Sequence, residues 1–143
     1  FHAITRNSRL MNRLTHTMVG GLATKTFCYE IVASCLVATK SGIARLQGPR
    51  GATGAVTGAC SGLEARFQGE CLRAAVKIDR EQAEAIAQRA FAAYKDDLDK
   101  KPYGVPFWEA YDLKTIKPLP NWLDCYNAVR EEAISWGLPL DQV

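Results

Sequence analysis

The stretch LQGPRGATGAVTGACSGLEARF, residues 46–67, places five glycines between two different patterns of secondary structure. Residues 43–47 predict a short strand that runs into the glycine loop. Ser61 and Glu64 then form the S-x-x-E pattern of a capping box, which predicts a helix from residue 62 to about 77. A strand, a loop and a helix in this order are typical of an α/β fold with parallel strands.

The glycine loop matches none of the specific phosphate-binding patterns. No lysine follows the glycines, as a P-loop requires, and no two glycines stand two apart, as a dinucleotide-binding loop requires. The Gly-X-Y triplets break at Thr57, too early for a triple helix. Three interpretations stay open: a rim that binds a ligand at the end of a strand, an anion site at a helix N-terminus, and a packing turn without a ligand.

Helical periodicity covers most of the remaining chain. We expect helices over residues 24–40, 80–99, 107–111 and 120–136, and the end of a second strand at 17–19. Residues 3–15 predict a short helix or an irregular entry. One or two strands cannot close a parallel sheet, so the pattern indicates a chain that lacks an N-terminal part of its fold.

Composition describes one globular domain of ordinary character. The chain has 143 residues, 48% of them hydrophobic, and a net charge of +3, which is too small to indicate nucleic-acid binding. No segment has the form of a signal peptide or a membrane span, so we expect a cytoplasmic protein. The five cysteines have irregular spacing, which predicts reduced, mostly buried thiols and no metal site.

Four charged or titratable positions have a predicted role of their own. Glu64 is expected to cap its helix, and Arg66 to pair with Glu70 four residues on. Glu30 lies in an otherwise apolar helix, which predicts a partly buried salt bridge. His16 precedes a predicted strand end, where it could serve as a ligand or a base.

Several segments together resemble the C-terminal part of the monomethylamine:corrinoid methyltransferases. Their order and spacing, rather than any single motif, carry the resemblance from about residue 18 to the end, and residues 1–17 match less clearly. The segments are Gly20-Gly21, Phe27-Cys28-Tyr29-Glu30, Ser61 to Phe67 with Gly69-Glu70, Tyr111 to Pro118, Trp122 to Tyr126, and Trp136-Gly137-Leu138.

The resemblance implies that the whole chain, 1–143, is one partial domain: the mostly helical C-terminal portion of a (β/α)8 TIM-type barrel. The complete family members transfer the methyl group of monomethylamine to the Co(I) corrinoid of a partner protein in methanogenesis. Their pyrrolysine lies upstream of this chain, so the catalytic residues stay unknown and the chain alone is expected to be inactive. We expect a fragment, the alternative being a shortened, non-catalytic relative that acts as an interaction module.

The resemblance also implies partners and a binding face. The corrinoid is carried by the cognate corrinoid protein, so no cofactor or metal is expected on this chain itself, and the complete protein is expected to form a homo-oligomer. Neither nucleic acid nor a membrane is an expected partner. The barrel rule predicts that the face for substrate or corrinoid partner includes Gln47, Gly48, Arg50, Gly51 and His16.

Overall fold

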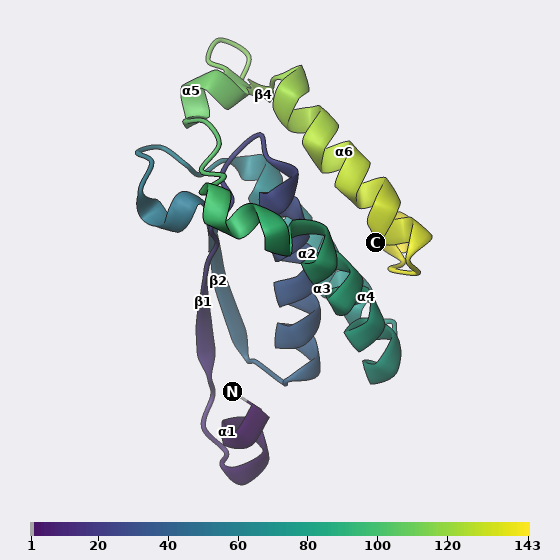
Figure 1. The fold of residues 1–143 in the computed structure, drawn as a ribbon. Coiled ribbons are helices and arrows are strands. Elements are labelled where there is room, and N and C mark those ends of the chain that lie inside the picture. The colour runs from purple at the N-terminus through teal and green to yellow at the C-terminus, as the bar shows by residue number, and fades with distance from the viewer. Residues whose placement is uncertain (1) are drawn as a thin grey trace.

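The computed structural model describes residues 2–143, and Figure 1 shows their arrangement. Two parallel strands, β1 (Arg13–Thr17) and β2 (Arg45–Arg50), lie side by side and are joined by the helix α2 (Lys25–Lys40). The short helix α1 (His2–Asn7) precedes β1 at the end where the strands begin. The helical layer covers one face of the two strands only, and the other face is open (Figure 1).

The long helices begin and end where their capping residues predict. Thr24 caps α2 by accepting a hydrogen bond from the backbone N–H of Phe27. The helix α3 (Gly62–Val76) begins with the predicted capping box, in which Glu64 binds Ser61. A second capping box, at Asp79, opens α4 (Arg80–Tyr94). The continuation that we predicted to residue 99 as part of this helix is a separate 3₁₀ segment, η2 (Lys95–Lys100).

The remaining elements are short, apart from the last helix. The C-terminal part of the chain crosses above the strand ends and then returns along the helical layer as α6 (Figure 1). These elements are η1 (Ala52–Gly54), α5 (Phe107–Ala110), β3 (Tyr111–Asp112), β4 (Lys117–Pro118), α6 (Pro120–Ser135) and η3 (Leu140–Gln142). Strands β3 and β4 form a small antiparallel pair.

Helix α2 is the centre of the core, because α3, α4 and α6 all pack against it. Eleven of its sixteen residues are buried, which explains why it carries apolar side chains around most of its circumference. Phe27 is fully buried and stacks on Trp122 of α6, with ring centroids 6.1 Å apart. This pair ties the last helix to the start of the first long one.

Both strands differ from the sequence prediction. Residues 13–17 form β1, although we expected only a strand end at 17–19. Strand β2 begins at Arg45 and continues through Gly48 and Pro49 to Arg50, which we had assigned to the loop. The register explains this extension: Thr15 pairs with Gln47 and Thr17 with Arg50, so β2 holds one extra residue in a bulge. Glycine and proline are tolerated in a strand at such a bulge.

Among the described residues, no helix is long and apolar enough to cross a membrane. All five cysteines are free thiols, and Cys28, Cys35 and Cys71 are buried, as the sequence predicted for most of them.

Candidate functional site at the strand ends

The carboxyl ends of β1 and β2 lie next to each other, below the loops and short elements of the C-terminal part (Figure 1). We call the two segments that follow these strands, residues 18–24 and 51–61, the rim. In parallel β/α folds, ligands bind at this end of the sheet. The rim is therefore the candidate functional site.

The two strands present different chemistry on their two faces. Leu14, His16 and Leu46 face the helices and are buried or half-buried. Side chains that alternate with them point to the open face. All of these are polar and exposed: Arg13, Thr15, Thr17, Arg45, Gln47 and Arg50. The structure thus brings the predicted residues Gln47 and Arg50 together on one polar face.

Backbone hydrogen bonds join the two rim segments. The N–H of Met18 donates to the carbonyl of Arg50 at 2.9 Å, and the N–H of Thr53 donates to the carbonyl of Met18 at 2.7 Å. The N–H of Ala52 donates to the carbonyl of Gly20 at 2.8 Å. The position of Arg50 therefore depends on the segment that follows β1.

The glycines of the rim serve close packing. A Cβ on Gly21 would fall on the carbonyl of Tyr103, because the segment 101–106 crosses directly over this point. Gly48 has a φ of +113°, and a Cβ there would lie 2.8 Å from the carbonyl of His16. Both positions require glycine for steric reasons, independent of any ligand.

Much of the rim backbone is not free to bind an anion. The backbone N–H groups of residues 52–55 all donate to carbonyl groups of the protein itself. The N–H of Ser61, at the start of α3, binds the carboxylate of Glu64. Of the three interpretations of the glycine loop, the geometry therefore disfavours the anion site.

Glu30 has a different partner from the one that we predicted. No ion pair among the described residues involves it, so the predicted salt bridge is wrong. Its carboxylate instead accepts the backbone N–H of Val19 at 3.0 Å and that of Gly20 at 2.7 Å. Burial raises the pKa of Glu30, and these two hydrogen bonds oppose that shift.

His16 lies on the helix side of β1, away from the open face. Its Nδ1 is 3.3 Å from Ser34 Oγ and 3.3 Å from Gln68 Nε2, and the side chain is buried. Burial lowers the pKa of His16 to about 4, so the ring is neutral at pH 7. His16 does not share a face with Gln47 and Arg50, and we do not carry it forward as a substrate contact.

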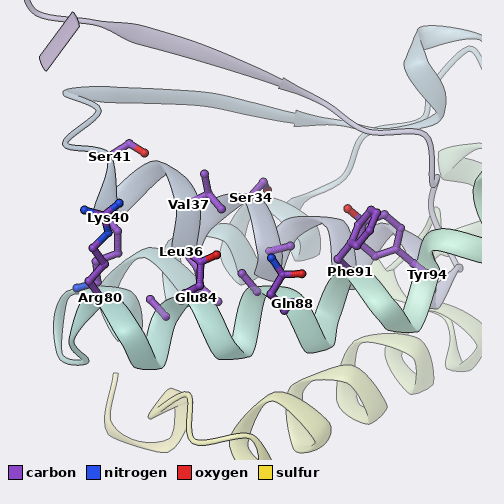
Figure 2. A pocket seen from close by; sticks show the side chains of 13 residues that line it. Ser34, Leu36, Val37, Lys40, Ser41, Arg80, Glu84, Gln88, Phe91 and Tyr94 are labelled. Atoms are coloured by element: carbon purple, nitrogen blue, oxygen red, sulfur yellow. The ribbon is translucent and has the colours of Figure 1, made fainter. Parts of the chain in front are cut away.

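A groove of about 540 Å³ lies elsewhere, between α2 and α4. Figure 2 shows Lys40 and Arg80 at one end of it and Phe91 and Tyr94 at the other, with the strands to one side. No residue of the rim lines this groove, and neither do Gln47 and Arg50, so the groove is separate from the candidate site. No group of three or more His, Cys, Asp or Glu residues within the described part of the chain could hold a metal ion.

The sequence did not reveal two residues of the open face, or the hydrogen bonds by which Glu30 supports the rim. Thr15 and Thr17 alternate with Leu14 and His16 along β1. This alternation includes too few apolar residues for the strand to be recognised from the sequence. The residue pattern of the helix singled out Glu30 but could not show that backbone groups bind it.

A parallel strand–helix–strand unit with loops at its strand ends places this chain among the β/α proteins. The family described as monomethylamine methyltransferase MtmB has a model that matches residues 1–138. The chain belongs to this family.

Curated relatives and solved structures agree with this assignment. MtmB2 of Methanosarcina barkeri strain Fusaro is 31% identical over 118 residues, which make up 82% of this chain and 26% of that protein. MtmB of Methanosarcina mazei is 30% identical over the same length and coverage. The chain thus spans about a quarter of the length of these curated relatives.

The crystal structure of the Methanosarcina barkeri monomethylamine methyltransferase superposes on 94% of this chain with a TM-score of 0.88, at 27% sequence identity. The match covers 30% of that protein and falls in its C-terminal part. A crystal structure of a hydroxylamine complex of MtmB matches equally well. The predicted fold, the mostly helical C-terminal part of a (β/α)8 barrel, is confirmed.

Proposed function

We propose that this chain supplies the last strands, rim and C-terminal helices of a methylamine methyltransferase. The complete protein would transfer the methyl group of monomethylamine to the Co(I) corrinoid of a partner protein, in methanogenesis from methylamines. One observation carries the proposal: the family match extends over residues 1–138, and within it two parallel strands end beside a polar, exposed face.

The charges of the open face suggest which of its residues binds the amine and which binds the corrinoid partner. It carries Arg13, Arg45 and Arg50 but no carboxylate from either strand. An alkylamine is protonated at neutral pH, as a lysine side chain is, and a cationic surface repels it. We therefore assign Gln47, whose amide oxygen can accept a hydrogen bond, to the amine, and Arg50 to the corrinoid partner. Gly48 shapes the backbone between these two side chains, and Gly51, directly after Arg50, packs closely against the carbonyl of Gly20.

The corrinoid belongs to the partner protein in this proposal, and its Co(I) supplies the nucleophile that accepts the methyl group. The pyrrolysine and the other catalytic residues would come from the part of the barrel that precedes this chain. Without them the chain lacks the groups that stabilise the transition state, and we expect no methyl transfer from it alone. A cytoplasmic location, a homo-oligomeric complete protein and the absence of nucleic-acid and membrane partners stay predictions.

The test uses the complete gene product with its cognate corrinoid protein reduced to Co(I). Conversion to methyl-Co(III) is followed by absorbance as the concentrations of monomethylamine and corrinoid protein are varied separately. We expect Gln47→Ala to raise the KM for the amine, and Arg50→Ala to raise the KM for the corrinoid protein, each by roughly tenfold, the cost of one hydrogen bond with a charged partner. Arg73→Ala, an exposed arginine on α3, is the matched control.

Kinetics of Gln47→Ala and Arg50→Ala that match those of Arg73→Ala would contradict these two assignments. If the complete protein binds the corrinoid protein but leaves Co(I) unmethylated, the proposed activity is wrong and the non-catalytic interaction module is favoured.

A further inference from the structure

The carboxylate of Glu30 connects the helical layer to the rim. Glu30 is only 8% exposed and lies in the second turn of α2. Its Oε1 accepts the N–H of Val19 and its Oε2 accepts the N–H of Gly20, so both oxygens hold consecutive residues of the segment after β1. Hydrogen bonds to a charged acceptor are stronger than those between neutral groups, and a buried one is not weakened by competition with water.

The residues that Glu30 holds are those that hold the segment after β2. Gly20 donates its N–H to Glu30 and accepts the N–H of Ala52 on its carbonyl. Met18, one residue before Val19, accepts the N–H of Thr53 and donates to the carbonyl of Arg50. A continuous series of hydrogen bonds therefore runs from the Glu30 carboxylate through residues 18–20 to Arg50 and the turn that follows it.

Close packing against α2 also holds this segment in place. Gly20 lies against the backbone of Phe27, so close that a Cβ would collide with it. The backbone of residues 19 and 20 is thus pressed onto the first turn of α2, and Glu30 reaches it from one turn further along. Tyr94 of α4 is the titratable side chain that interacts with Glu30 from a neighbouring element.

We propose that Glu30 is the positioning residue of the rim: its carboxylate fixes residues 19 and 20, and through them Ala52, Thr53 and Arg50. Glu30 itself is buried, so it acts on the rim through these backbone groups. Its importance for methyl transfer rests on the proposed function, whereas the coupling between Glu30 and the rim stands on the hydrogen bonds alone.

The experiment compares two buried carboxylates changed in the same way. Glu30→Gln keeps the shape of the side chain, but an amide has one acceptor oxygen, so its NH₂ group opposes one of the two backbone donors. Glu70→Gln is the control. Glu70 is 5% exposed and binds Tyr126 and Arg66 in the helical layer, with no contact to the rim.

Amide hydrogen exchange of the 143-residue chain is then measured by NMR. For each amide, the exchange rate in the variant is divided by its rate in the unmodified chain. In Glu30→Gln we expect this ratio to be at least about tenfold larger for Ala52 and Thr53 than for the amides of α3. In Glu70→Gln any acceleration should be the same at all these sites, or larger in the helices. Equal acceleration of Ala52 and Thr53 in the two variants would overturn the proposal.

A titration supplies a signature that general destabilisation does not produce. In the unmodified chain, the amide shifts of Gly20 and Ala52 should follow one common midpoint as the pH is lowered, and in Glu30→Gln neither should show it. If the amide chemical shift of Ala52 does not change at the midpoint pH found for Gly20, the coupling is contradicted. Methyl transfer by the complete protein is measured separately, so inactivity there would count against the proposed function and leave the coupling standing.

Discussion

The two faces of the β1–β2 pair are made from the same strands and have opposite chemistry. The face toward the helices carries Leu14, His16 and Leu46, and the first residue after β1, Met18, is buried in the core as well. The open face carries threonine, glutamine and arginine. Successive side chains of a strand point to opposite faces. A substitution at one position therefore affects mainly the stability of the core, and one at its neighbour affects mainly the candidate site.

The largest difference in the free energy of unfolding is expected between substitutions of the neighbouring residues Met18 and Thr17. Met18 is 5% exposed, so Met18→Ala removes buried apolar surface and leaves a cavity, which should lower the free energy of unfolding by about 2–5 kcal/mol. Thr17→Ala, on the open face, should change it by less than about 0.5 kcal/mol. Urea denaturation followed by tryptophan fluorescence measures both values. Similar losses for the two variants would mean that the open face is also part of a packed core.

A smaller effect on the free energy of unfolding should come from the protonation of His16, on the face toward the helices, as the pH is lowered. The folded-state pKa of about 4 lies below the usual 6.5, so the unfolded chain binds more protons between these pH values. The stability is complete above pH 6.5 and falls as the pH approaches 4. We expect a loss of about 1–2 kcal/mol between pH 7 and pH 5, which follows from about 1.4 kcal/mol per unit of pKa difference.

His16→Asn isolates this contribution, because it removes the titrating ring and keeps a polar side chain. Burial raises the pKa values of Glu30 and Glu64, whose effect on stability has the opposite sign and is common to both proteins. The difference between the unmodified chain and His16→Asn should therefore vary with pH in the same window. A difference that stays constant from pH 7 to pH 5 would show that His16 is not the group responsible.

The smallest effect is expected on the open face, where Arg13 and Arg45 are direct partners in the parallel register. Like charges on adjacent strands repel, so Arg45→Thr should raise the free energy of unfolding by about 0.2–0.5 kcal/mol at low salt. The gain should shrink in 1 M salt, where the repulsion is screened. Thermal denaturation at two salt concentrations measures it, and a salt-independent change would point to strand propensity instead.

The sequence predicted the helices well because their signals are local. The capping boxes at Ser61 and Asp79 and the apolar periodicity of α2 lie within one element and need no knowledge of partners. Strand β1 escaped prediction because its open face is polar, so residues 13–17 lack the apolar alternation that a strand with one buried face usually shows. The end of β2 was missed because Gly48 and Pro49 suggest a loop unless the bulge is known.

The candidate site was predictable only in part, for a related reason. The barrel rule pointed to Gln47, the last residue of the predicted strand, and to Arg50, which we had assigned to the loop after it. It also pointed to His16, whose orientation depends on the register of a strand that the sequence did not reveal. The partner of Glu30 is a pair of backbone N–H groups, and any residue type at positions 19 and 20 other than proline would provide them.

The crossing of residues 101–106 over the rim has a consequence for the order of folding. Gly21 donates its N–H to the carbonyl of Pro102, and Val105 donates to the carbonyl of Leu22, which joins residues more than eighty positions apart in the chain. Closing so long a loop carries a large entropic cost before any contact repays it. We therefore expect α2, α3 and α4 to associate first, and the rim to acquire its final shape only when this late crossing segment arrives.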